Sequence, residues 1–391
     1  MFETLETAKP DPIFAVVAAV GGDQRPDKID LSIGVYHDKE GRTPIMGAVR
    51  SAERRLLETR QTKSYLGLAG DPHFTAGMTD MVFADSGDRD RMRAVQAPGG
   101  SGALRILAEL IKRAKPDARV WLSTPTWPNH PAIMQAAGLE ICSYPYFDPE
   151  TSEVRADAML EALGEAGPGD AVVLHGCCHN PTGAELKPEH WDAIADLAVD
   201  RGFLPFVDFA YQGFGDGLEQ DAYGVRRLAG KVGEMVLASS CSKNFGLYRD
   251  RVGCAFLLGS SAERADVMSG QLQSVARANY SNPPAQGAEI VGVILEDDAL
   301  RAEWISELDT MRDHMLGLRH KLSAELRAKS NSDRFDFLSQ HRGMFSLSGV
   351  TRELVAQLRD DHAIHMVGSG RLNIAGLPQA EIGRFADALL A

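Results

Sequence analysis

Short apolar segments alternate with amphipathic segments between residues 94 and 258. The apolar segments, which are typical of buried strands, lie at 94–97, 119–123, 171–175, 203–208 and 235–239. Helical spacing of apolar residues indicates helices over 103–113 and from Pro188 to just before Gly202. This alternation predicts an α/β fold, in which helices cover both faces of a mostly parallel sheet and ligand-binding groups gather at the carboxyl ends of the strands.

A different pattern begins near residue 300. Apolar residues recur there at alternating spacings of four and three: Trp304, Leu308, Met311, Met315, Leu318 and Leu322. One long helix would carry them as a seam, which could join two chains or, as we favour, connect the large domain to a second one. After it, strands at 344–348 and 371–375 enclose a helix that begins near Thr351, which predicts a small α+β unit.

Charge and hydropathy argue against two classes of partner. The chain has 41 Lys and Arg residues against 54 Asp and Glu residues, and the formal net charge of −13 disfavours binding to nucleic acid. The longest apolar stretch near the N-terminus, residues 13–20, is too short to span a bilayer and follows no basic segment. We therefore expect neither a membrane-spanning helix nor a signal peptide.

The cysteines indicate a reducing environment. Their number is five, and an odd count fits free thiols in the cytoplasm better than a disulfide framework. Cys177 and Cys178 stand beside His175 and His179, which are residue types that bind zinc. Neighbouring side chains on a strand point to opposite faces, so we interpret both as buried free cysteines at a strand end and expect no metal site.

The segment 240–253 carries the most chemical information. Lys243 lies in a polar turn after the strand at 235–239, with Ser240 before it and Arg251 eight positions later. An amine can condense with an aldehyde, and hydroxyl and guanidinium groups can hold a phosphate. Pyridoxal phosphate requires these groups, so we interpret Lys243 as its Schiff-base lysine.

Two further strand ends carry matching polar groups. Asp208 ends the strand at 203–208, with Tyr211 three residues later, and Asn180 follows the strand at 171–175. The cofactor ring withdraws electrons while its nitrogen is protonated, and a carboxylate such as Asp208 would keep it so. Tyr211 and Asn180 could hydrogen-bond the phenolic oxygen of the ring. Singly, Asp208 could instead cap a helix and Asn180 could form an Asx turn.

The glycine turn Gly99–Gly102 allows more than one interpretation. It could be a simple structural turn. Its backbone N–H groups at a helix start could also bind a phosphate, and we favour this interpretation because Ser240 and Arg251 offer further phosphate donors. A nicotinamide-dependent dehydrogenase is the alternative, but Arg105 occupies the position of the expected third glycine. Asp117, the acidic residue that would bind the ribose, falls in a loop before the next strand.

Three larger side chains fit a substrate site and also have ordinary structural explanations. Trp127 follows the strand at 119–123 and could stack on a ring or belong to the core. Arg277 and Arg371 lie among small polar residues, where a guanidinium could hold a carboxylate by two hydrogen bonds or form a surface ion pair.

Taken in order, these motifs resemble the aspartate/aromatic amino acid aminotransferases, class I, subgroup Iα, of the fold-type I pyridoxal-phosphate enzymes. The resemblance runs nearly end to end, through Ile33-Gly34-Val35-Tyr36, Lys63-Ser64-Tyr65-Leu66-Gly67, Trp127-Pro128-Asn129-His130, His179-Asn180-Pro181-Thr182-Gly183, Asp208-Phe209-Ala210-Tyr211, Ser242-Lys243-Asn244-Phe245-Gly246, residues 277–284 and Gly343-Met344-Phe345-Ser346. It implies a large cofactor-binding domain over residues 44–310, a smaller α+β domain formed by 11–43 and 311–391, and an N-terminal arm over 1–10. It also implies a homodimer in which this arm lies on the neighbouring subunit.

The resemblance assigns a role to each site residue. Lys243 would hold the cofactor and move the substrate proton, Asp208 would pair with the ring nitrogen with His130 behind it, and Trp127 would stack on the ring and border the substrate. Asn180 and Tyr211 would bond the phenolic oxygen. The phosphate would bind to Gly100, Ser101, Ser240, Arg251 and, from the partner subunit, Tyr65. The substrate α-carboxylate would bind to Arg371, Asn180 and Gly34, and the distal carboxylate to Arg277 of the partner subunit.

The implied reaction is ping-pong transamination, in which an L-amino acid leaves as its 2-oxo acid and 2-oxoglutarate then leaves as L-glutamate. The amino donor stays open between aspartate, phenylalanine and tyrosine, and a strictly aromatic-specific enzyme is an alternative. His37, Ser64 and Ser101 depart from the residues most usual in aspartate-type enzymes, whereas Val35, Thr43 and Asn282 agree with them. A regulator that uses such a domain as a ligand sensor would need a DNA-binding extension, for which residues 1–30 leave no room.

Overall fold

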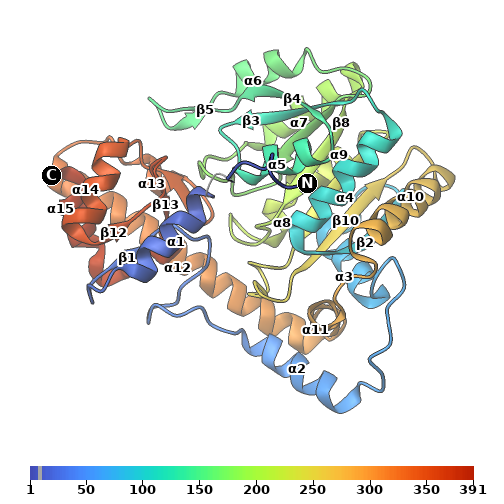
Figure 1. The fold of residues 1–391 in the computed structure, drawn as a ribbon, viewed down its shortest axis with the longest axis horizontal. Coiled ribbons are helices and arrows are strands. Elements are labelled where there is room, and N and C mark those ends of the chain that lie inside the picture. The colour runs from blue at the N-terminus through green and yellow to red at the C-terminus, as the bar shows by residue number, and fades with distance from the viewer. Residues whose placement is uncertain (8–10) are drawn as a thin grey trace.

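The computed structural model describes residues 1–7 and 11–391. Figure 1 shows two lobes, a larger one built around a central sheet and a smaller one that contains the C-terminus, with helix α12 (Asp298–Ser330) passing between them. This arrangement is the α/β fold that the alternating pattern predicts, accompanied by a small α+β unit.

The central sheet has seven strands in the order β2-β10-β9-β8-β7-β3-β4. Their bounds are β2 Met92–Pro98, β3 Arg119–Thr124, β4 Glu140–Pro145, β7 Ala171–His175, β8 Leu204–Phe209, β9 Met235–Ser240 and β10 Val252–Leu258. All pairs are parallel except those of β10, which is antiparallel to both β2 and β9. The predicted strands are present, and β4 and β10 are additional.

Helices cover both faces of this sheet. Side chains alternate along each strand, so that Leu174 belongs to one buried cluster and Val173 to another. The cluster of Val173 includes α4 (Gly99–Ala114), α5 (Asn129–Ala136) and α10 (Ala262–Tyr280). On the Leu174 side lie α2 (Gly47–Thr59), α3 (Pro72–Phe83), α6 (Ala156–Leu163), α7 (Pro188–Arg201), α9 (Tyr223–Ala229) and α11 (Ala285–Glu296).

Helix α12 carries the predicted apolar seam, and every seam residue is buried. Trp304 belongs to the core of the large lobe and stacks on Phe245, with ring centroids 4.4 Å apart. Leu318 and Leu322, further along the helix, belong to the core of the small lobe. The seam therefore serves as the expected connection between two units of one chain.

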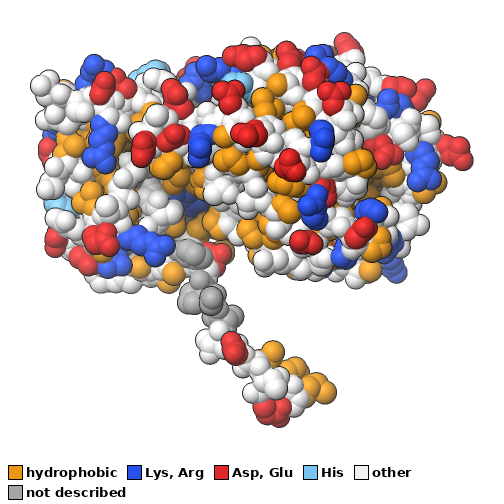
Figure 2. All heavy atoms as spheres, turned by 90° about the horizontal axis from the view of Figure 1, so that it is seen from above, with side chains coloured by type: hydrophobic (Ala, Val, Ile, Leu, Met, Phe, Trp, Pro, Cys, Tyr) orange, Lys and Arg blue, Asp and Glu red, His pale blue; other side chains and the backbone are white. Residues whose placement is uncertain are grey.

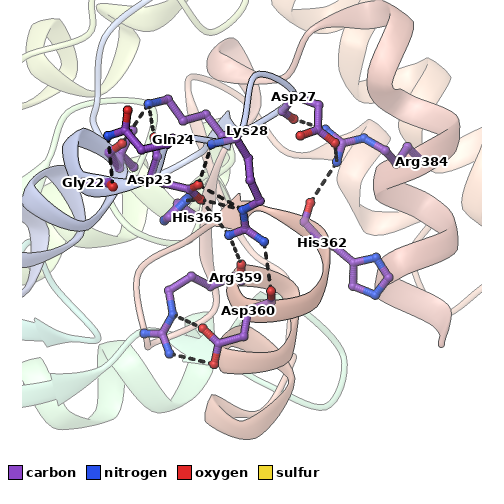
Figure 3. A network of polar contacts seen from close by, with 12 residues as sticks. Gly22, Asp23, Gln24, Asp27, Lys28, Arg359, Asp360, His362, His365 and Arg384 are labelled. Carbon is purple, nitrogen blue, oxygen red and sulfur yellow. Dashed lines mark hydrogen bonds and ion pairs between the residues drawn. The ribbon is translucent and has the colours of Figure 1, made fainter.

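The small lobe joins two distant parts of the chain. Strand β1 (Ile29–Asp30) pairs in parallel with β12 (Ile364–His365), and Leu31 shares a buried cluster with the C-terminal helices α14 (Arg352–His362) and α15 (Ile382–Leu390). The carboxylate of Asp23, after α1 (Pro12–Gly22), lies 2.8 Å from His365 Nε2 within a polar network (Figure 3). These contacts agree with the expected division into 11–43 plus 311–391, which stays a prediction.

The start of the chain lies apart from both lobes. Met1, Phe2 and Leu5 are exposed, and the segment before the undescribed residues projects from the body of the molecule (Figure 2). Residues 8–10 of the predicted arm lie outside the described residues. Among the residues that the structure describes, no helix is long and apolar enough to cross a membrane.

Candidate functional site

A cavity of about 230 Å³ opens where the carboxyl ends of the central strands face the small lobe. Eleven of the predicted site residues line it: Gly34, Gly100, Ser101, Trp127, Asn180, Asp208, Tyr211, Ser240, Lys243, Arg251 and Arg371. They come from segments far apart in the sequence, which the parallel strands and the small lobe bring together. His130 lies directly behind the cavity, against Asp208.

Lys243 stands in the turn between β9 and β10, one strand away from Asp208. Burial lowers the pKa of its amine to about 8, although the nearby carboxylate of Asp208 acts in the opposite direction and Arg251 in the same one. Its Nζ atom lies 5.0 Å from the centre of the Tyr211 ring. About a tenth of this amine is therefore unprotonated at pH 7, far more than for an ordinary lysine, and available as a nucleophile or base.

Asp208 lies in β8, and its carboxylate is hydrogen-bonded to His130. Burial alone would raise the pKa of its carboxyl, but the hydrogen bond with His130 and the charges of His130, His175 and Lys243 lower it overall. The His130 Nε2 atom is 2.9 Å from Asp208 Oδ2, while the Thr126 hydroxyl lies 2.8 Å from the other ring nitrogen. The carboxyl of Asp208 is thus kept ionised in a buried site.

An anion-binding cradle lies beside the lysine. Helix α4 begins at Gly99, so the glycines that we expected to precede a helix at residue 103 form its first turn instead. A Cβ atom at Gly99 would lie 2.5 Å from Arg251 Nη2, and one at Gly100 would lie 3.0 Å from Ser240 Cβ. Free backbone N–H groups, a hydroxyl and a guanidinium therefore converge on one small space.

Arg371, in β13 (Arg371–Asn373), enters the cavity from the small lobe. Its guanidinium donates hydrogen bonds to Asn180 Oδ1, at 3.3 Å, and to the carbonyl of Ser32, and its Cζ lies 4.3 Å from the centre of the Phe345 ring. The Nε atom is buried without a hydrogen-bond partner. One face of this guanidinium is thus packed, and one donor remains for a ligand such as a carboxylate.

Two predicted residues lie outside the cavity of this chain. Tyr65 is 91% exposed, and Arg277 lies exposed at the end of α10. Neither lines the cavity described here, and their expected role in a partner subunit stays a prediction.

Several lining residues were not predicted. Ser242 accepts a hydrogen bond of 3.2 Å from Arg251, and the Tyr248 hydroxyl accepts one of 3.0 Å from the Tyr36 amide. His175, Phe345 and Ile13 also border the cavity. Ser242 and Tyr248 lie close to Lys243 in the sequence, and this proximity could have predicted that they border the cavity. Ile13 has no such signal, because α1 reaches the cavity only through the packing of the small lobe.

The expectation that the side chains of Cys177 and Cys178 point to opposite faces of a strand is wrong. Strand β7 ends at His175, and Cys178 has a φ of 52°, so the two sulfur atoms and a carboxylate oxygen of Asp221 lie within 4.8 Å of one another. That carboxylate already accepts hydrogen bonds from the amides of Gly213, Gly215 and Asp216. Burial also raises the pKa of both thiols, which opposes metal binding by thiolate.

Fold and cavity define an α/β protein with a buried amine, an ionised aspartate and two arginines facing one cavity between two lobes. The family model for aminotransferase class I and II matches residues 26–389, and the chain belongs to that family. This confirms the predicted resemblance and supports transamination over the dehydrogenase alternative.

Known relatives match over the whole length. The chain is 46% identical over 390 residues to an aromatic-amino-acid aminotransferase of Paracoccus denitrificans, covering 100% of this chain and 99% of that one. It is 44% identical over 394 residues to an aspartate aminotransferase of Salmonella typhi, with 100% of both chains covered. The structure of an aromatic-amino-acid aminotransferase from Burkholderia pseudomallei, described as covalently bound to pyridoxal phosphate, is 39% identical with a TM-score of 0.97, covering 100% of this chain and 98% of that one.

Proposed function

We propose that this chain catalyses pyridoxal-phosphate-dependent transamination between an L-amino acid and 2-oxoglutarate, with Lys243 as the residue that binds the cofactor. The observation that carries the proposal is a buried amine whose pKa is lowered to about 8, in the same cavity as an ionised aspartate and an anion cradle. The relative described as covalently bound to pyridoxal phosphate supports the choice of cofactor.

The residues of the cavity fit this cofactor. The cradle of Gly100, Ser240 and Arg251 has the donors that a phosphate needs, and added Cβ atoms would fill it. Asp208 would face the ring nitrogen and keep it protonated, because its own carboxyl is held ionised by His130. Asn180 and Tyr211 would bond the phenolic oxygen, Trp127 would cover the ring, and Ser101 would join the phosphate donors.

Bound pyridoxal phosphate supplies an electron-withdrawing ring that stabilises negative charge at the substrate Cα. The chain supplies the proton transfer and the orientation. Lys243 would take the proton from Cα and return it one step later, since a base with a pKa near neutrality can do both. Arg371, with Asn180 and Gly34, would fix the α-carboxylate so that the Cα–H bond points at this amine.

We infer that the complete site is composite, formed by two copies of the chain. Tyr65 and Arg277, the residues expected to bind the phosphate and the distal carboxylate, are both exposed away from the cavity of their own chain. Ile45 and Leu57, which flank the start and end of α2 near Tyr65 in sequence, are also exposed apolar residues, at 53% and 85%. Exposed apolar side chains beside functional polar ones favour a homodimer interface.

Aspartate and aromatic amino acids are the candidate donors, because relatives named for each activity are 44–46% identical. The test is a panel of amino acids with 2-oxoglutarate, measured as kcat/KM. A ratio between aspartate and phenylalanine below about 10³, equivalent to about 4 kcal/mol, supports dual use, and a larger ratio establishes a single preference. Absence of amino transfer from every donor would overturn the proposed function.

A further inference from the structure

Arg319, on α12, is a fully buried arginine outside the cavity, with an exposed fraction of 0%. Its five N–H groups make six hydrogen bonds, with one N–H shared between two acceptors, and all six go to uncharged oxygens. Five go to the carbonyls of Leu338 (3.1 Å), Arg342 (3.2 Å), Gly343 (3.2 and 2.9 Å) and Phe345 (2.6 Å), and the sixth goes to the Ser346 hydroxyl (2.8 Å). Burial lowers the pKa of Arg319 to about 9, so the side chain stays charged at neutral pH.

A buried charge is tolerated when every donor is satisfied. Most acceptors of Arg319 are backbone carbonyls of residues 342–346. The conformation of this segment therefore determines whether the donors of Arg319 are satisfied. The reverse also holds, because the planar guanidinium donates in fixed directions and leaves the 342–346 segment few alternatives. The Arg319 guanidinium and the 342–346 segment therefore fix each other's conformation.

The 342–346 segment is also confined by the large lobe. The Arg342 amide donates a 2.9 Å hydrogen bond to the carbonyl of Gly183. A Cβ atom at Gly183 would lie 2.2 Å from the Phe345 carbonyl oxygen, and one at Gly343 would lie 2.4 Å from Cys178 Cβ. The segment thus lies between α12 and the loop that contains Asn180, and it packs so closely on that loop that neither Gly183 nor Gly343 has room for a side chain.

This segment leads directly to the substrate-binding arginine. Phe345 begins strand β11 (Phe345–Leu347), which pairs antiparallel with β13, and Leu347 is opposite Arg371 in that ladder. The Phe345 ring lies under the Arg371 guanidinium at 4.3 Å and would contact any side chain at Gly34 at 2.7 Å. Two groups of the proposed carboxylate site, Arg371 and Gly34, therefore pack against a ring that Arg319 holds through its backbone.

We propose that Arg319 is a positioning residue for the carboxylate-binding site: by fixing the carbonyls of the 342–346 segment it sets where Phe345 and Arg371 lie, and so the affinity for carboxylate substrates. The inference rests on the proposed function of Arg371. It differs from a purely stabilising role, because the latter would lower the amount of folded protein and leave the affinity of the folded fraction unchanged.

The test compares the full-length protein, with the cofactor it retains on purification, in wild-type, Arg319→Lys and Arg319→Met forms. Calorimetric titration with succinate and with 3-phenylpropionate measures carboxylate affinity without turnover. We expect Arg319→Met to raise both dissociation constants, and the KM for the amino donor, at least about tenfold while kcat changes less than about threefold. Arg319→Lys keeps the positive charge but lacks the planar guanidinium, so its dissociation constants and KM should lie between those of the wild type and Arg319→Met.

Arg301→Met is the matched control, because Arg301 is exposed on the same helix, and it should change neither affinity nor KM. In the double variant Arg319→Met/Phe345→Leu the two effects should be strongly non-additive, since both act on the packing of Arg371. Folded Arg319 variants with wild-type dissociation constants would overturn the inference and leave the proposed function intact. Wild-type protein that binds neither probe and transfers no amino group would overturn the proposed function instead.

If neither Arg319 variant folds, Ser346→Ala decides, because it removes one of the six hydrogen bonds. A rise of about two- to threefold in both dissociation constants supports the inference. Unchanged values in a folded Ser346→Ala protein contradict it.

Discussion

The Nε2 atom of His130 lies 2.9 Å from Oδ2 of Asp208, and this contact opposes the effect of burial on the carboxyl. Without the histidine, its hydrogen bond and its charge no longer lower the pKa of Asp208, so this pKa should rise. The His130→Ala variant should therefore lose activity at the acidic end of its pH profile, with the acid limb of kcat/KM moved to higher pH.

The same variant should bind pyridoxal phosphate about ten- to a hundredfold more weakly, the usual effect of losing a hydrogen bond to a charged group. Fluorescence titration of the cofactor-free protein measures this affinity. His190→Ala is a suitable control, since this histidine lies on α7 outside the cavity. An unchanged acid limb would show that His130 does not control the charge of Asp208.

The sequence was most informative where reactive or polar residues lie at the end of a predicted strand. Lys243, Asp208 and Asn180 could be predicted together because parallel strands end at one edge of the sheet, which brings distant polar residues into one cavity. Phe345 and Ile13 could not, because their positions depend on how the small lobe packs against the large one.

Local backbone geometry explains the errors. The predicted separation of Cys177 and Cys178 assumed a strand that in fact ends two residues earlier, and the positive φ of Cys178 then turns its side chain toward its neighbour. Similarly, the glycines at 99–102 predict a turn before a helix at residue 103, whereas α4 begins at Gly99. A Cβ atom at Gly99 or Gly100 would lie close to Arg251 or Ser240, so these positions need glycine for space.

Arg277 should determine the choice of side chain in the amino donor. The Arg277→Asp variant replaces a cation by an anion, so it should lower kcat/KM for aspartate at least about a hundredfold more than for phenylalanine. Steady-state kinetics with both donors measures the difference. Equal losses for the two donors would show that Arg277 does not contact the substrate side chain.

A composite site can be tested by complementation. Lys243→Ala and Arg277→Asp should each be inactive with aspartate, but a hybrid dimer of the two would contain one site with both wild-type residues. Random reassociation of equal amounts after mild denaturation should recover about a quarter of the wild-type activity, because half the dimers are hybrids with one intact site. No recovery, with hybrids verified by a purification tag on one chain, would place Lys243 and Arg277 in the same subunit's site.

Asp23 should stabilise the small lobe in a pH-dependent way. Hydrogen bonds from Arg25 and His365 hold the pKa of its carboxyl well below the ordinary value (Figure 3). A depressed pKa in the folded state stabilises the protein above the unfolded pKa of about 4, and this stabilisation is lost as the pH falls through the folded value.

Urea unfolding of wild type and Asp23→Asn from pH 7 to pH 3 measures the effect. The difference in unfolding free energy should be largest near neutral pH and should shrink below about pH 4. A difference that does not depend on pH would contradict the assigned role of this carboxylate.

The most direct test of the central claim is to locate the cofactor on the chain. Protein loaded with pyridoxal phosphate is treated with borohydride, digested and analysed by mass spectrometry, with Lys243→Ala as the control. We predict a single phosphopyridoxyl modification, on Lys243, and none in the variant. A modification on another lysine, or none on the wild-type protein, would contradict the account.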